Sequence, residues 1–96
     1  MATGTIQKTG VLFAERSNIS VTISTQGGYH SIGDAYTDYG VPRDAIIVGM
    51  YIVGWTGGTG VPSLAFGSNG HTLYCMMSDA PTSITLTKVR IVYMLP

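Results

Sequence analysis

The chain has 96 residues, zero formal net charge and 10% charged residues. This length suits a single domain that spans residues 1–96, and the five Lys and Arg residues are scattered, which argues against a nucleic-acid partner. Because charged residues usually make up about 25% of a globular protein, we expect part of the surface to be buried between subunits.

The first part of the chain predicts strands separated by a glycine-rich turn. Thr5–Ala14 reads as a strand, and we expect a break or bulge at Gly10. In Asn18–Ser24, isoleucine and valine alternate with polar residues, which is typical of a strand with one face in the core and one in solvent. Tyr29–Tyr36 is a weaker strand or extended segment, and Thr37–Asp44 is a connection.

The longest apolar run predicts a strand over Ala45–Trp55, after a turn at Val41–Asp44. Its β-branched residues and two glycines favour a strand over a helix, and it is too short for a helix that crosses a bilayer, which needs about 20 residues. Because both faces are apolar, we expect both to be covered, one by a second sheet and one by another subunit. Trp55 continues one apolar face, so we expect it to be buried. The residues that we assign to the subunit interface are Val48, Met50 and Ile52.

The remaining chain predicts three strands. A glycine-rich turn at Thr56–Gly60 precedes them, and further turns join them. The last strand changes phase, because its early apolar residues, such as Ile84, and its late ones, such as Ile91, have opposite parity. A slip of one residue turns every later side chain to the other face, so we expect a bulge near Thr87-Lys88 or a strand that passes between sheets. The three strands are Ser63–Phe66, His71–Met77 and Ser83–Leu95.

No segment shows apolar residues at a helical period. About seven to eight short strands with glycine-rich turns predict an all-β fold, an antiparallel β-sandwich that is jelly-roll-like. The single cysteine, Cys75, alternates with Leu73 and Met77 in a strand-like run. We interpret it as a buried apolar residue rather than a reactive thiol.

The sequence shows no pattern typical of catalysis. Asp34 and Asp38 are the closest acidic pair, and we interpret them as solvated loop residues rather than the two carboxylates of a glycosidase. The two histidines are far apart in sequence and have no second ligand at metal-binding spacing. The segment Gly57–Gly60 lacks the lysine and the following helix of a phosphate-binding loop. We therefore expect no enzymatic activity, no metal and no cofactor.

Aromatic and hydrogen-bonding residues gather at or near predicted strand ends. They suit a sugar, whose apolar face packs on a ring while its hydroxyls meet polar side chains. Rings at strand ends are also typical of core caps and of oligomer contacts. We expect the loops Tyr29–Tyr39 and Thr56–Gly60 to carry the ligand contacts. The candidate ligand-binding residues are Tyr29, His30, Tyr36, Asp38, Tyr39, Asn69 and His71.

The segment Val41–Trp55, in which a proline precedes the apolar run and a Gly-Trp pair closes it, is similar to a segment that recurs in C-terminal domains of phage and prophage tail-fibre-like proteins. The resemblance extends to the Thr- and Val-rich last strand, Ser83–Met94, and to the early Gly-Gly-Tyr turn at 27–29. It implies a small β-sandwich at the distal tip of a fibre, assembled as a homotrimer, that binds a bacterial surface glycan or protein. It assigns no particular binding residues.

Two hypotheses follow for the function. In the first, the chain is a non-enzymatic, trimeric receptor-binding tip domain of a phage tail fibre or similar virion protein, and it binds bacterial surface carbohydrate. Such a protein is made in the cytoplasm of the bacterial host and becomes part of the virion. In the second, the domain oligomerises or caps a fibre or virion without binding a ligand. Neither hypothesis involves membrane insertion.

Overall fold

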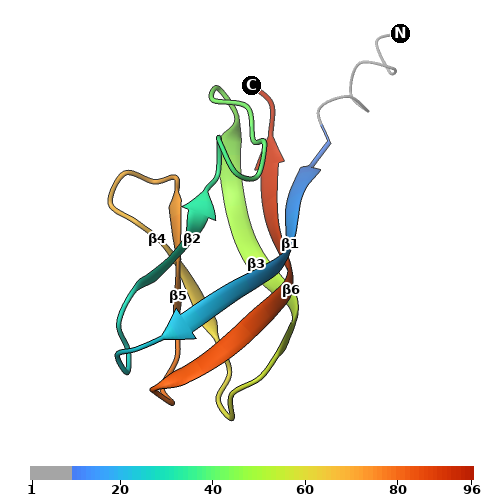
Figure 1. Ribbon diagram of the computed structural model, residues 1–96. Helices are drawn as coiled ribbons and strands as arrows, with labels where there is room; N and C mark the ends of the chain where they lie inside the picture. Colours follow the sequence, from blue (N-terminus) through green and yellow to red (C-terminus); the bar gives the residue numbers. More distant parts are fainter. Residues whose placement is uncertain (1–9) are drawn as a thin grey trace, which may run out of the picture.

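The computed structural model describes residues 10–96, which contain no helix, and hence none long and apolar enough to cross a membrane. These residues form two antiparallel sheets of three strands each, in the orders β1-β6-β3 and β2-β5-β4 (Figure 1). The strands are β1 (Leu12–Ile23), β2 (His30–Asp34), β3 (Ile46–Thr56), β4 (Ser63–Phe66), β5 (Thr72–Met76) and β6 (Thr82–Met94). The all-β class is confirmed, but the described residues form six strands rather than seven to eight.

The strand count is lower because the end of the predicted strand Thr5–Ala14 and most of the predicted strand Asn18–Ser24 belong to the single strand β1. Gly10 comes before this strand and does not interrupt it, while residues 5–9 of the prediction lie outside the described part. Asn18 has a φ of 56°, in the left-handed region that asparagine tolerates better than most residues. The local turn of the backbone at Asn18 lets β1 continue while the side of the strand that faces the core changes.

The last strand carries the bulge that its phase change predicts. In the ladder between β3 and β6, Gly54 pairs with Lys88 and Trp55 pairs with Leu86, so Thr87 is an extra residue. This bulge confirms the irregularity expected near Thr87-Lys88. It lets apolar residues on both sides of it point into the core. The buried apolar residues of β6 are Ile84, Leu86, Val89 and Ile91.

The apolar run that we expected to be covered on both faces is β3, and it lies at the edge of its sheet. Its ladder with β6 shifts at Val48, so the alternation implied by the sequence does not hold. Met50 and Ile52, which we assigned to a subunit interface, pack against the domain's own core. Val48 is 59% exposed, and Trp55, which we expected to be buried, is 39% exposed because an edge strand has a neighbour on one side only.

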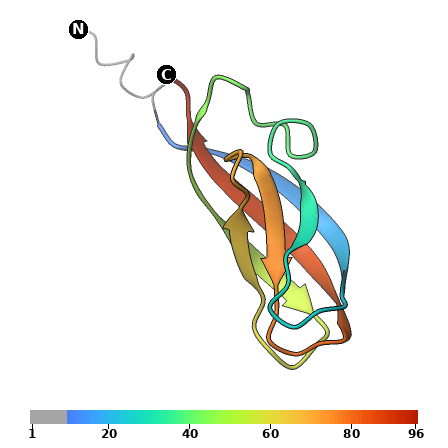
Figure 2. The same ribbon diagram turned by 90° about the vertical axis from the view of Figure 1, so that its left-hand side faces the viewer.

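The core lies between the two sheets, and in Figure 2 the β2-β5-β4 sheet lies in front of the β1-β6-β3 sheet. Cys75 is fully buried, as predicted, and burial raises the pKa of its thiol. The largest fully buried side chains come from both sheets, and they are Ile23, Leu73, Cys75, Leu86, Val89 and Ile91.

The strands place two groups of loops at opposite ends of the molecule (Figure 1). One end carries the loop after β2 and the turn between β4 and β5, and the C-terminus also lies there. The other end carries the turn between β1 and β2, the loop after β3 and the turn before β6. The predicted ligand-binding residues are divided between these two ends.

Candidate functional site

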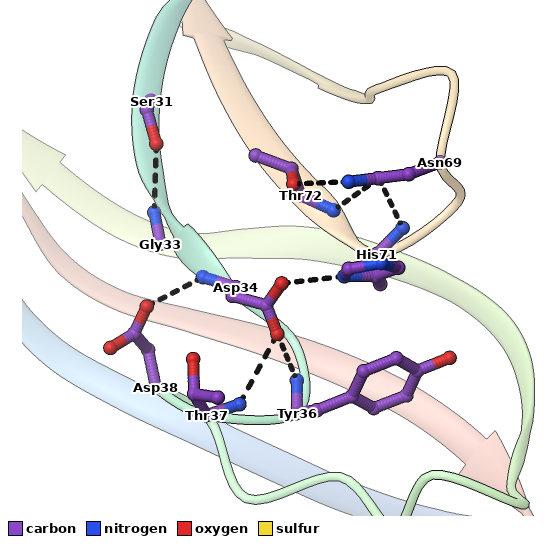
Figure 3. A network of polar contacts seen from close by, with 9 residues as sticks. All are labelled: Ser31, Gly33, Asp34, Tyr36, Thr37, Asp38, Asn69, His71 and Thr72. Carbon is purple, nitrogen blue, oxygen red and sulfur yellow. Dashed lines mark hydrogen bonds and ion pairs between the residues drawn. The ribbon is translucent and has the colours of Figure 1, made fainter.

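Four of the predicted residues come together at the first of these ends (Figure 3). Tyr36 and Asp38 lie in the loop after β2, whereas Asn69 and His71 lie in the turn between β4 and β5. The two segments meet because β2 and β5 are antiparallel neighbours. We call this region the Tyr36–His71 site.

Asp34, the last residue of β2, links the two segments of the site. Its Oδ2 lies 2.5 Å from Nδ1 of His71, and its Oδ1 accepts hydrogen bonds from the backbone amides of Tyr36 at 2.8 Å and Thr37 at 3.2 Å. Partial burial acts to raise the pKa of Asp34, but the bonds from His71 and the two amides outweigh it and lower that pKa below its usual value. The charged carboxylate is therefore an internal anchor of the site.

Tyr36 presents the aromatic surface of the site. Its ring lies against the imidazole of His71, with centroids 4.8 Å apart and planes tilted by 31°. The guanidinium of Arg43 lies over the same ring, 5.1 Å from its centroid, a geometry that favours a cation–π interaction. Arg43 is exposed, and within residues 10–96 its guanidinium forms no ion pair. A ring, an imidazole and an exposed cation thus share one small surface.

Asp38 and Asn69 hold the backbone of the site and remain exposed. Oδ2 of Asp38 accepts a hydrogen bond from the amide of Asp34 at 2.6 Å. Oδ1 of Asn69 accepts hydrogen bonds from the amides of His71 and Thr72, both at 2.9 Å. Both loops are therefore fixed by side chains of the domain itself, and Figure 3 shows the Asp38 carboxylate on one side of Asp34 and the Tyr36 ring on the other.

Tyr39 is not a surface contact, and its assignment to the ligand site is wrong. Its side chain is buried, and its hydroxyl donates a hydrogen bond to the carbonyl of Ile32 at 3.1 Å. Arg16 donates to the same carbonyl at 3.0 Å. Burial raises the pKa of Tyr39 to about 12. Tyr39 is thus a core cap, the alternative interpretation of rings at strand ends.

Tyr29 and His30 lie at the opposite end of β2 and do not reach the Tyr36–His71 site. The His30 ring is used to hold the preceding turn, since its Nδ1 lies 2.8 Å from the carbonyl of Gly28 and its Nε2 accepts a bond from the amide of Ser24 at 3.2 Å. Tyr29 is 69% exposed, and its ring lies 5.7 Å from that of Tyr74. These two residues therefore belong to a separate surface.

The loop Thr56–Gly60 also lies at that opposite end, where Asp79 holds it. Oδ2 of Asp79 accepts hydrogen bonds from the amide of Thr59 at 2.6 Å and from its hydroxyl at 2.9 Å. These two bonds from Thr59 are the main cause of the lowered pKa of Asp79. The two loops that we expected to form one ligand site are therefore at different ends of the molecule.

Two surface hollows lie away from the Tyr36–His71 site, and neither is lined by a charged or aromatic side chain. The smaller, of about 310 Å³, lies on β1, β6 and the end of β3, and the larger, of about 430 Å³, lies at the end that carries the loop after β3. Neither offers a ring for stacking or a charge for orientation. Residues that line the larger hollow include Gln26, Val61, Ser63, Met76 and Ser78.

Sequence reasoning missed two contributors to the site, Asp34 and Arg43. Asp34 has a local signal, because an aspartate at a strand end often bonds amides two and three residues later and starts a turn. Its contact with His71 has no such signal, since 37 positions separate the two residues. The position of Arg43 over a ring likewise depends on how its loop folds back.

The Asp34–His71 pair has the form of a base and its orienting carboxylate. Within residues 10–96, no serine hydroxyl or cysteine thiol is hydrogen-bonded to His71 as a nucleophile would be, and no three His, Cys, Asp or Glu residues gather in a way that could hold a metal ion. Comparison of the chain with protein-family models, with curated proteins and with solved structures finds no match.

Proposed function

We propose that this chain is a small, jelly-roll-like β-sandwich that serves as a non-enzymatic receptor-binding domain of a phage tail fibre or similar virion protein. In this proposal the domain binds bacterial surface carbohydrate at the Tyr36–His71 site. The observation that carries the proposal is the exposed end on which the Tyr36 ring, the His71 imidazole and the Arg43 guanidinium lie together.

The chemistry of the site supports a sugar ligand. The apolar face of a pyranose packs on an aromatic ring, and its hydroxyls bond carboxylates, amides and guanidinium groups. Tyr36 supplies the ring, Asp38 supplies an acceptor, and Arg43 supplies donors. A neutral sugar fits better than an anionic one, because Asp34 and Asp38 place two carboxylates in the site against the one guanidinium of Arg43.

The rigidity of the site supports binding at low entropic cost. Asp34 ties the loop after β2 to the turn before β5, and Asn69 closes that turn. Groups that are already ordered lose little conformational freedom when a ligand arrives. The same bonds engage both oxygens of Asp34 within the domain, which argues against Asp34 as one of the two carboxylates of a glycosidase.

The proposed assembly is a homotrimer. It is supported by the low content of charged residues, by the resemblance to fibre-tip domains, and by large apolar side chains that are exposed on the described single chain. The same observation favours a second candidate function, a domain that oligomerises or caps a fibre or virion and binds no ligand. This candidate predicts that substitutions in the Tyr36–His71 site are silent in every binding assay.

A glycan array and a cell-binding assay with the purified chain test the proposal. We expect wild-type protein to bind neutral glycans and Tyr36→Ala to bind them at least about tenfold more weakly, a loss equivalent to about 1.4 kcal/mol. Tyr29→Ala is the matched control, because it removes an exposed tyrosine ring at the opposite end. The proposal fails if wild-type protein binds neither glycans nor cells, or if the two variants lose binding equally.

A further inference from the structure

The imidazole of His71 uses only one of its two nitrogens within the described domain. Nδ1 lies 2.5 Å from Oδ2 of Asp34, and within residues 10–96 no hydrogen bond reaches Nε2. Of the side-chain nitrogen and oxygen atoms in this part of the chain, Oδ1 of Asp79 is the one that is both buried and without a partner. Nε2 of His71 is therefore open to solvent, in a side chain that is 30% exposed. A free ring nitrogen thus remains at the Tyr36–His71 site.

Asp34 determines which nitrogen of this imidazole carries the hydrogen. Its Oδ1 accepts bonds from the amides of Tyr36 and Thr37, and carboxyl groups are ionised at neutral pH. An ionised carboxylate only accepts hydrogen bonds, so Nδ1 of His71 is the donor in the contact with Oδ2. In a neutral imidazole the other nitrogen then has a lone pair and no hydrogen. Nε2 of His71 is therefore a hydrogen-bond acceptor.

Acceptors are scarce beside the aromatic surface of the site. Oδ1 of Asn69 accepts two backbone amides, and both oxygens of Asp34 have partners. The Asp38 carboxylate lies on the other side of Asp34 from the Tyr36 ring (Figure 3), and a guanidinium such as that of Arg43 brings only donors. The His71 imidazole lies directly against the Tyr36 ring. Its Nε2 is thus the acceptor closest to the place where a sugar would stack.

We propose that His71 selects the ligand, because its Nε2 accepts a hydrogen bond from a hydroxyl group of the bound sugar, and that Asp34 is the positioning residue that fixes the imidazole in the accepting tautomer. The bond to Asp34 and the ring contact with Tyr36 hold the imidazole at two points, so its free nitrogen has a fixed direction. This inference rests on the proposed function, since it names the group of the Tyr36–His71 site that meets the ligand.

Protonation of His71 would remove this acceptor. A histidine side chain changes its charge between about pH 5 and 8, and both nitrogens of an imidazolium are donors. The hydrogen of the sugar hydroxyl then loses its partner. Carboxylates and guanidinium groups keep their charge over this range, and the turn that carries His71, residues 67–70, contains no charged residue. The titratable and charged groups that face the imidazole are Asp34 at the end of β2 and Tyr36, Asp38 and Arg43 in the following loop.

The pH dependence of glycan affinity tests the proposal. Calorimetric titration uses the full chain and a glycan that binds on the array. We expect the wild-type affinity to fall about fivefold from about pH 8 to about pH 5, the loss expected for one hydrogen bond. His71→Phe keeps a ring against Tyr36 and removes both nitrogens, so it should bind more weakly and show no pH dependence. The matched control is His30→Phe at the opposite end, which should keep the wild-type affinity and its pH dependence.

NMR of the isotope-labelled wild-type chain tests the tautomer without any substitution, and it decides the matter if His71→Phe does not fold. At neutral pH we expect the hydrogen of the His71 ring on Nδ1 and none on Nε2. Addition of the same glycan should move the Nε2 signal of His71 and leave that of His30 unchanged.

The outcomes separate this inference from the proposed function. A hydrogen on Nε2 of His71 in the free protein overturns the inference alone. So does a glycan affinity that is lost in Tyr36→Ala but does not depend on pH in the wild-type chain. A His71→Phe variant that binds weakly with the wild-type pH dependence also overturns it, because a purely structural role of His71 gives that result. A wild-type chain that binds no glycan overturns the proposed function, and this inference with it.

Discussion

At each end of the molecule an aspartate carboxylate holds the loops in place, but the two ends present different surfaces. At one end the Asp34 carboxylate binds amides of its own loop and the ring of His71; at the other the Asp79 carboxylate binds the amide and hydroxyl of Thr59. Both carboxylates connect two loops that are distant in sequence. The surfaces that they support differ, because the Asp34 end presents a ring and a cation, whereas the loop held by Asp79 is mostly glycine. A loop fixed by a carboxylate thus does not by itself present a ring and a cation.

Replacing Asp34 and Asp79 one at a time is the most direct test of the difference between the two ends. We expect Asp34→Ala to weaken glycan binding by more than the tenfold expected for Tyr36→Ala, because it frees both segments of the site at once. Asp79→Ala should lower the melting temperature and leave binding unchanged. Calorimetric titration of each variant with a bound glycan from the array measures the difference. Equal binding by the two variants would mean that the Tyr36–His71 site is not the ligand site.

A glycine next to Asp34 and a glycine in the loop held by Asp79 extend the comparison to stability. Gly33 has a φ of 117°, and a Cβ there would lie 2.7 Å from Nη1 of Arg16; Gly57 has a φ of 91°, and a Cβ there would lie 2.7 Å from the carbonyl of Ser83. We expect Gly33→Ala and Gly57→Ala each to cost about 2 kcal/mol of unfolding free energy, measured by urea unfolding. Gly49→Ala is the control, because a Cβ there meets nothing within 4 Å.

Of these two variants, only Gly33→Ala should also alter the Tyr36–His71 site. A Cβ on Gly33 would approach Oδ2 of Asp38 to 3.0 Å, so Gly33→Ala should weaken glycan binding as well as stability. Gly57→Ala should affect stability alone. A Gly33→Ala variant with wild-type affinity would show that Asp38 and the loop after β2 are not part of the ligand contacts.

How far the sequence predicts this fold depends on how regular each strand is. The strands β4 and β5 and the later half of β1 were predicted well, because alternation alone marks a short strand with one buried face. The bounds of β3 were also predicted to within one residue, but its position at the edge of the sheet was not. Its shifts at Val48 and Val53 leave no trace in a run that is apolar on both faces, and strand order depends on pairings that no local pattern encodes. The change of face in β6 could be predicted, since it moves the apolar residues to the opposite parity.

The kinds of residue in the candidate site could be predicted from the sequence, but the contacts between them could not. Rings and polar groups near strand ends pointed to Tyr36 and His71, and the structure brings those two together. The role of Asp34 depends on the pairing of β2 with β5, and the burial of Tyr39 depends on how the following loop folds over the core. Both are properties of the packed chain, and so a sequence pattern could not separate the buried Tyr39 from the half-buried Tyr36.

A substitution at Tyr39 should have a smaller effect at the end of the molecule that carries the Tyr36–His71 site. We expect Tyr39→Phe to cost about 1 kcal/mol or less of unfolding free energy, because it removes one hydrogen bond while Arg16 still donates to the Ile32 carbonyl. Glycan affinity should not change, since the ring stays in the core. Urea unfolding and calorimetric titration measure the two quantities. A large loss of affinity would return Tyr39 to the ligand site.

The smallest expected effect is the difference in acid sensitivity between the two anchors. The pKa values of Asp34 and Asp79 are both lowered from 3.8 in the folded chain. A carboxyl whose folded pKa is depressed stabilises the protein above its unfolded pKa, and this contribution is lost as pH falls through the folded pKa. We therefore expect the melting temperature of wild-type protein to fall as pH drops below 3.8, and Asp34→Asn and Asp79→Asn each to reduce that fall. Because His71 adds a bond to Asp34 but not to Asp79, the two variants should reduce the fall in melting temperature by different amounts. A wild-type melting temperature that rises below that pH would show that neither carboxylate anchors its loop.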